Sequence, residues 1–189
     1  MAKSTKSLPP KLEAVLIRLG KAKPLNVTQA VKLPYLVDVV AMHVLGRRIT
    51  EGHHQAWDHG VVTSEVWHYL NKSESSSVFH LELVPWSEEK RVVIDAAEPH
   101  ELTPEEEAIV DFIAQELVLK AGELGRLTKF MNPEISAWGN GNRNAGLGPD
   151  AYDRLSQDYQ EMAELVASLT VDQLRRSSTK VEDIEDAVA

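Results

Sequence analysis

The stretch NVTQAVKLPYLVDVVAMHVLG, residues 26–46, decides the fold of this chain. Asn26 is a good helix N-cap, and Gln29 stands three residues later in capping-box register. Apolar residues then recur at helical spacing as far as Gly46, a residue typical of helix ends. Because Pro34 removes one backbone donor, we expect a kink one turn before it. A helix that is apolar on several faces is predicted to lie at the centre of the core.

The same rules predict further elements around this helix. Residues 11–23 have apolar side chains at helical spacing, and Thr63 is in position to cap another helix. The segment LTPEE, residues 102–106, is the strongest helix start, with Thr at the N-cap, Pro at N1 and Glu at N3. Residues 77–84 alternate in polarity, and residues 90–96 follow a turn-like segment. The predicted fold class is therefore α+β, a predominantly α-helical single domain with a short β-hairpin.

The chain divides into three parts by composition. Residues 1–10 are predicted to be a mobile basic tail, residues 11–140 the folded domain, and residues 141–189 a flexible loop with a C-terminal helical extension. The segment ITEGHHQAWDHGVV, residues 49–62, contains two glycines and three histidines, and we interpret it as a connecting segment. The segment GNGNRNAGLG, residues 139–148, is predicted to be a flexible loop.

Composition restricts the class of protein. The 189 residues are 43% hydrophobic and 26% charged, which is enough to form a core. No apolar run approaches the ~20 residues of a membrane span, and the N-terminus lacks the apolar region of a signal peptide. The chain has no cysteine, so disulfides and thiolate metal sites are excluded. We expect a cytoplasmic protein that does not associate with membranes.

The net charge of −9 is unevenly distributed. Residues 1–48 hold nine Lys/Arg and two acids, net +7, whereas the other 141 residues hold eleven Lys/Arg and twenty-seven acids, net −16. The acidic part disfavours broad nucleic-acid binding, because phosphate contacts need Lys and Arg. The basic segment could contact an anionic partner, but charge patterning favours a face that balances the acidic part within the fold.

No motif for catalysis or cofactor binding is present. Zinc needs convergent ligands at suitable spacing, and the five clustered histidines match no established spacing: His43, His53, His54, His59 and His68. The glycine-rich loop lacks the Gly-Lys-Ser/Thr ending of a phosphate-binding loop, and no GxSxG motif occurs. We therefore predict no catalytic residue, no cofactor and no metal. A small enzyme that uses the histidine segment is the least favoured alternative.

Three stretches in order together resemble one known family. TQAVKLPYLVD, residues 28–38, looks like the helix motif Lys-Leu-x-Tyr-Leu-x-Asp of the SocA-like antitoxin family, also called the Panacea domain. AWDHGVVTSEVW, residues 56–67, is similar to the family's Trp-x-x-Gly-Pro-Val followed by a helix, with Val61 in place of Pro. Residues 102–121 and 124–138 look like its late helix and terminal Trp. The motif positions are Lys32, Leu33, Tyr35, Leu36, Asp38, Trp57 and Gly60.

This resemblance implies an antitoxin of a toxin–antitoxin pair. Its partner would be a cognate toxin protein encoded nearby, bound directly and without turnover. Because at least one member of the family delivers its toxin to a protease, the resemblance also implies a proteolytic adaptor role with a cytoplasmic AAA+ protease as a second partner. The alternative from a different class is a DNA-binding transcriptional regulator that uses the basic N-terminal segment, although no recognition helix rich in Arg, Asn and Gln is evident.

Two segments could present the partner-binding surface. One is the turn that holds Asp58 and His59, where a neighbouring Gly allows close approach of another backbone. The other holds Phe130 and Trp138 around a proline. Tryptophans in such segments more often complete a core, and otherwise they anchor interfaces. For Trp57 we predict a primarily structural role.

Overall fold

The computed structural model describes residues 8–71, 79–83, 90–94 and 102–116, together with Gly125 and Thr128. Most of the expected basic tail, the loop at residues 139–148 and the C-terminal extension lie outside these ranges. So do the two partner-binding candidates Phe130 and Trp138.

Helices form most of the described structure. They are α1 (Pro10–Ala22), α2 (Val27–Leu45), α3 (Ser64–Asn71) and α4 (Pro104–Glu116). The strands are β1 (Leu25–Asn26), β2 (His54–Trp57), β3 (Gly60–Thr63), β4 (Phe79–Leu83) and β5 (Lys90–Ile94). This arrangement confirms the predicted α+β class with a helical majority. Within the described ranges, no helix combines the length and apolarity needed to cross a bilayer.

Local capping explains where the helices begin and end. At the start of α2, the Gln29 amide donates to the Asn26 side chain over 2.8 Å, and Gln29 Oε1 accepts from the Asn26 amide over 3.0 Å. This reciprocal pair is the predicted capping box. Gly46 ends α2 in the left-handed conformation, with φ of 67°. Thr103 and Glu106 form the equivalent pair at the start of α4, at 2.9 and 3.3 Å.

The predicted hairpin is confirmed as β4 and β5, which pair antiparallel with Leu81 opposite Val92. One further strand, β1, pairs with β5 on its other side, so that the sheet order is β1-β5-β4. With two residues, β1 is too short to give the alternation that identifies strands in a sequence.

The interpretation of residues 49–62 as a connecting segment is wrong for its second half. Strands β2 and β3 form an antiparallel hairpin in which Trp57 pairs with Gly60, leaving Asp58 and His59 as the turn. Gly60 has φ of 95°, a conformation that L side chains rarely adopt. All four residues of β3 are buried, so the strand lacks the alternation of a half-exposed strand.

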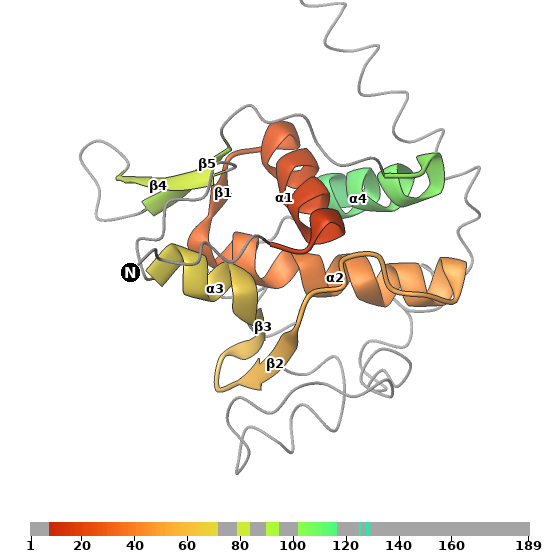
Figure 1. Cartoon of the computed structure of the whole chain (residues 1–189), viewed down its shortest axis with the longest axis horizontal. Coiled ribbons are helices and arrows are strands. Elements are labelled where there is room, and N and C mark those ends of the chain that lie inside the picture. Colours follow the sequence, from red (N-terminus) through yellow and green to blue (C-terminus); the bar gives the residue numbers. More distant parts are fainter. Residues whose placement is uncertain are drawn as a thin grey trace, which may run out of the picture.

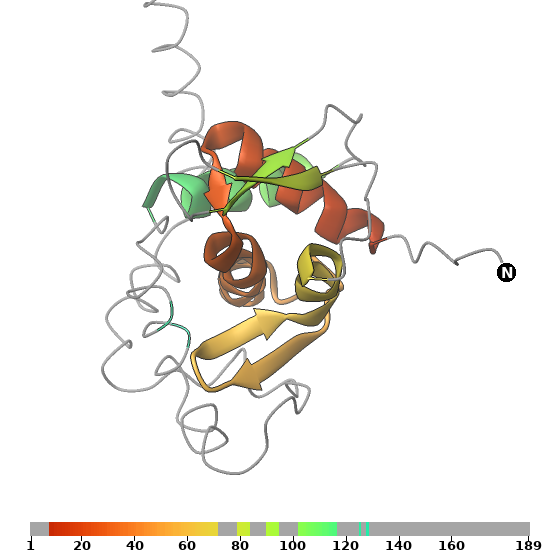
Figure 2. The ribbon, with the colours of Figure 1, turned by 90° about the vertical axis from the view of Figure 1, so that its left-hand side faces the viewer.

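Helix α2 lies between the other elements. Figures 1 and 2 both place α1 and α4 on one side of α2 and the β2–β3 hairpin on the opposite side. Every residue from Gln29 to Ala41 is buried, as the apolar pattern predicted. The largest fully buried side chains include Leu12 and Leu16 of α1, Leu33 and Leu36 of α2, and Ile109 and Ile113 of α4. The central helix can therefore position side chains of the hairpin relative to the core.

Candidate functional site

Three buried side chains of α2 face the β2–β3 hairpin. Lys32, Tyr35 and Asp38 recur at every third residue, so they follow one another along one side of the helix. Their exposed fractions are 4%, 0% and 0%. Leu33 and Leu36, which lie between them, belong to the hydrophobic core. We call Lys32, Tyr35 and Asp38 the clamp residues, because each contacts the hairpin or the segment that leads into it.

Lys32 holds the turn end of the hairpin. Its Nζ donates to the carbonyl oxygens of His59 and Val61 over 2.7 and 2.9 Å, and lies 3.5 Å from Thr128 Oγ1. These contacts use the three donors of an ammonium group. Burial lowers the pKa of Lys32 to about 8, so the group is still largely protonated at neutral pH. The ammonium therefore ties the turn to α2.

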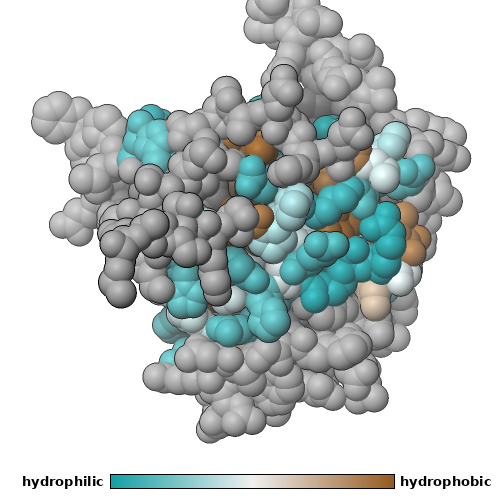
Figure 3. Space-filling view, viewed as in Figure 1, coloured by the Kyte–Doolittle hydropathy of each residue, from teal (hydrophilic) through white to brown (hydrophobic). Residues whose placement is uncertain are grey.

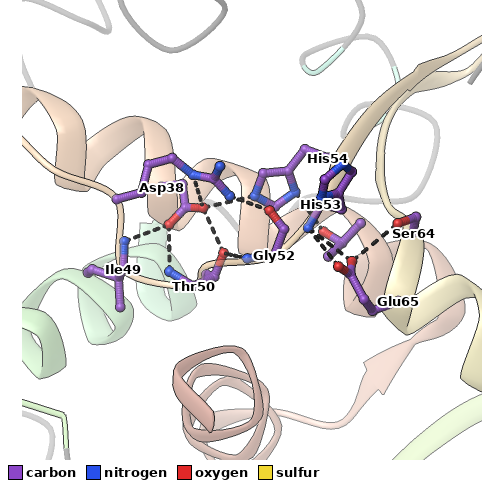
Figure 4. A network of polar contacts seen from close by, with 10 residues as sticks. Asp38, Ile49, Thr50, Gly52, His53, His54, Ser64 and Glu65 are labelled. Atoms are coloured by element: carbon purple, nitrogen blue, oxygen red, sulfur yellow. Dashed lines mark hydrogen bonds and ion pairs between the residues drawn. The ribbon is translucent and has the colours of Figure 1, made fainter. Parts of the chain in front are cut away.

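Asp38 holds the other end of the hairpin through a network of hydrogen bonds (Figure 4). Its Oδ1 accepts from the backbone amides of Ile49 and Thr50, both over 2.8 Å. Its Oδ2 accepts from Thr50 Oγ1 over 2.6 Å and from Arg48 Nε over 2.9 Å. His54 Nε2, from β2, lies 2.9 Å from the same oxygen. A single carboxylate therefore fixes both the loop after α2 and the first strand of the hairpin.

The electrostatics fix the protonation of this network. Burial by itself would raise the pKa of Asp38, but hydrogen bonds from His54 and Thr50 and the charge of Arg48 hold it at about 2. Burial, together with the charge of Arg48, lowers the pKa of His54 below its ordinary value although Asp38 acts to raise it. An ionised carboxylate and a neutral imidazole require that His54 Nε2–H donates to Asp38. Its Nδ1 then accepts from the Thr63 hydroxyl over 3.0 Å.

Asp38, His54 and Thr63 have the carboxylate–imidazole–hydroxyl order of a nucleophilic triad, but they are buried. Their exposed fractions are 0%, 2% and 0%, so a substrate cannot reach the Thr63 hydroxyl. The Tyr35 ring closes the network with an edge contact to the imidazole, at a centroid distance of 5.5 Å. What the arrangement can do is bind β2 and β3 to α2.

The histidines of the sequence cluster differ in their exposure to solvent. His54 is buried, His43 is half-buried with Nδ1 2.9 Å from the carbonyl oxygen of Val39, and the exposed histidines are His53, His59 and His68. Among the described residues, no group of three or more His, Asp or Glu side chains could hold a metal ion.

The start of the hairpin is also joined to α3. Both carboxylate oxygens of Glu65 accept from the His53 amide over 3.0 Å, and the Ser64 hydroxyl donates to Glu65 over 3.2 Å (Figure 4). The Ser64 amide donates to the His53 carbonyl oxygen over 2.9 Å. These contacts fix the base of the hairpin to the helix that follows it.

The turn end of the hairpin presents polar and aromatic groups. His59 is exposed, Asp58 and Trp57 are half-buried, and Gly60 is buried. Trp57 packs against the edge of the core and forms an edge-to-face pair with Trp67 of α3, with ring centroids 5.0 Å apart. Of the predicted turn residues, His59 is thus the one whose side chain is most available to a partner.

Basic side chains of the first 48 residues are used within the fold. Glu106 of α4 accepts from Lys11 and Arg47 over 2.5 and 2.9 Å, and Asp111 forms a two-bond pair with Arg18 at 2.5 and 2.6 Å. Among the described residues of this segment, the Lys and Arg side chains that contact groups within the fold include Lys11, Arg18, Lys32, Arg47 and Arg48. The charge asymmetry therefore joins the N-terminal half to α4.

The partners of Asp38, namely Arg48, Thr50 and His54, were not predicted from the sequence. One signal was present, because Lys and Asp are almost never fully buried unless they are paired. Lys32 and Asp38 are the only charged residues of a helix that is mostly apolar, apart from a histidine near its end, so both were expected to find partners outside it. The sequence does not say which partners, since these come from segments 10 or more residues away.

The fold and site define a helix-rich α+β domain that displays a hairpin clamped to its central helix. Residues 31–134 match the family described as antitoxin SocA-like, Panacea domain. This match covers more than half of the 189 residues, and the chain belongs to that family. No curated protein and no solved structure matched the chain.

Proposed function

We propose that the protein is an antitoxin that neutralises a cognate toxin, encoded nearby, by direct and stoichiometric binding. Membership of the antitoxin family supports a role in a toxin–antitoxin pair. The observation that carries the binding mechanism is the hairpin, which exposes His59 while its turn and base are held by Lys32 and Asp38. A surface that is fixed before binding loses less conformational entropy when a partner docks.

A non-catalytic mechanism accords with the site. The hydroxyl of Thr63 is closed off from solvent, and its hydrogen bond to His54 serves to hold two elements together. An antitoxin that acts without turnover must be present at least in equal amount to the toxin. Neutralisation should therefore follow the ratio of the two proteins.

The charge of the chain indicates the kind of toxin surface. Residues 49–189 carry a net charge of −16, and the stretch from Ile49 to Asn71 contains no Lys or Arg. Complementary charge steers association and selects partners. A toxin with a basic surface, such as one that engages nucleotides or RNA, fits this stretch. A cytoplasmic AAA+ protease is a second proposed partner. In that case this protein would act as a proteolytic adaptor that delivers the bound toxin to the protease.

His59→Ala tests whether the hairpin turn binds the toxin. We expect it to weaken toxin binding by ~1–3 kcal/mol, because interface energy concentrates in a few central side chains. The neighbouring gene product is co-expressed with this protein in bacteria, growth is scored, and the complex is co-purified and titrated. Trp138→Ala tests the second candidate segment in the same assay.

His80→Ala is the matched control, since His80 is an exposed histidine on β4, in the other sheet. It should leave binding unchanged. Direct binding is the wrong mechanism if the neighbouring protein is harmless alone. The same conclusion follows if growth is restored with no complex at any ratio of the two proteins.

A further inference from the structure

We propose that Lys32 is a positioning residue that holds His59 in its partner-binding position. This inference rests on the proposed function, because it assigns the hairpin turn to the toxin. The proposed role of Lys32 is separate from stabilising the core, to which the apolar residues of α2 contribute.

The first observation is that His59 takes part in both contacts. Its side chain is exposed, while its carbonyl oxygen lies 2.7 Å from the buried Nζ of Lys32. The same ammonium binds the carbonyl oxygen of Val61, two residues further along. Because Lys32 holds both carbonyl groups, it also fixes the backbone that carries the His59 side chain.

The second observation is that the distance along α2 from Lys32 to Asp38 is similar to the length of strand β2. Lys32 and Asp38 are six positions apart in the helix, which corresponds to a rise of about 9 Å. His54 and Trp57 are three positions apart in the strand, which corresponds to a length of about 10 Å. Asp38 contacts His54 at the base, and Lys32 contacts the turn. Each end of the hairpin therefore has its own charged anchor, and only the anchor at the turn acts on His59.

The third observation is that the His59 carbonyl is confined from another side. A Cβ added at Gly125 would lie 3.3 Å from that oxygen, and Thr128 Oγ1 lies 3.5 Å from the Lys32 Nζ. Two positions late in the chain thus pack against the turn at the point where Lys32 holds it.

Lys32→Met is the first test variant, because Met has a similar length and no donors. Amide hydrogen exchange is measured on the free protein, with Lys21→Met on the exposed end of α1 as the matched control. We expect residues 58–61 to exchange at least tenfold faster in Lys32→Met, with α2 amides unchanged. Unchanged exchange at the turn overturns the proposal.

A double-mutant cycle with His59→Ala provides the second readout. If Lys32 acts through His59, Lys32→Met should weaken binding of the co-purified neighbouring gene product about tenfold in the wild-type background. It should then weaken binding less than twofold when His59 is already Ala. Equal effects in both backgrounds mean that Lys32 acts elsewhere, and this result overturns the proposal.

Lys32→Gln, which keeps one donor group and removes the charge, replaces Lys32→Met if that variant fails to fold, with the same two readouts and the same expected directions. The proposed function can fail independently, which is the case when wild-type protein forms no complex with the neighbouring gene product. The exchange measurement on free protein then decides by itself whether Lys32 holds the turn.

Discussion

Asp38 shows why a charge can be kept inside an apolar helix. Its two oxygens accept from two backbone amides, a hydroxyl, a guanidinium and an imidazole. Burying an ion pair contributes little net stability compared with apolar packing, but removing one partner is costly. The carboxylate is thus better explained by the specific geometry that it imposes on the loop after α2 and on β2.

We predict that Asp38→Asn lowers the free energy of unfolding by ~2–4 kcal/mol. An amide cannot accept on both sides, and its NH₂ group would face donors, while Arg48 would lose its ion pair. Chemical denaturation monitored by circular dichroism measures the effect. The control is Glu82→Gln, which removes an exposed carboxylate between His80 and Arg91 and should leave the denaturation midpoint unchanged.

The pH dependence of stability should follow Asp38 and His54. The folded pKa of Asp38, about 2, lies below its ordinary 3.8, so the unfolded chain takes up the proton first. Its contribution is complete above about pH 4 and disappears as the pH falls towards 2, a loss on the order of 2 kcal/mol. Burial also holds the pKa of His54 below 6.5, so acidification below about pH 6.5 begins to destabilise the fold. Denaturation curves that are flat from pH 7 to 3 would contradict this prediction.

Helix α2 is the element that combines the local and the tertiary signals. Its ends are set locally by Asn26, Gln29 and Gly46. Its interior carries apolar side chains that form part of the core and two charged side chains, Lys32 and Asp38, that contact the hairpin, while Tyr35 belongs to the core and also contacts His54. Pro34 lies inside α2, which is a single helix from Val27 to Leu45.

Asn26→Ala should lower the free energy of unfolding by about 1 kcal/mol, because it removes an N-cap acceptor. Asn26→Ser should restore most of this loss, since a hydroxyl can accept from the Gln29 amide. Thermal denaturation of the two variants distinguishes capping from other contacts of this position. Equal destabilisation by Ala and Ser would indicate that the cap is not the cause.

The two hairpins differ in how clearly the sequence indicates them. The β4 strand alternates apolar and polar residues, which predicted a strand correctly. The β2 strand follows a loop that contains a glycine and begins with polar residues, while β3 is buried throughout. What makes residues 54–63 a hairpin is their contact with α2, and that contact is not visible in the local pattern.

At the scale of the whole molecule, the charge asymmetry is used to assemble the fold. Basic side chains of α1 and of the loop after α2 pair with the first turns of α4, which bears Glu106, Glu107 and Asp111. On the face in Figure 3, the described side chains are mostly hydrophilic with few apolar ones between them.

The protein should not bind duplex DNA at physiological salt with a dissociation constant tighter than about 10⁻⁴ M. Non-specific binding needs several free Lys or Arg side chains, and at least five of the basic side chains in residues 1–48 already contact groups within the fold. Fluorescence anisotropy with labelled upstream DNA, measured over a range of salt concentrations, checks this. A micromolar dissociation constant would favour the regulator over the antitoxin, provided that the logarithm of the binding constant falls linearly with the logarithm of the salt concentration.

The sequence alone determined the features that depend on neighbours within a few residues. Caps at Asn26 and Thr103, the helix end at Gly46 and the alternation in β4 involve spacings of one to four positions. Helix boundaries and the fold class followed from these patterns, whereas the family was indicated by the resemblance of three ordered motifs. The order of the motifs added the identification of Lys32 and Asp38 as positions of interest.

The tertiary structure decided which distant groups meet. Asp38 contacts His54 across 16 positions and Lys32 contacts His59 across 27, and neither distance leaves a periodic trace in the sequence. A buried charge requires a partner, but many polar side chains could have supplied one. Only the packing of α2 against the hairpin selects His54 for Asp38 and the His59 carbonyl for Lys32, because that contact brings these atoms within hydrogen-bonding distance.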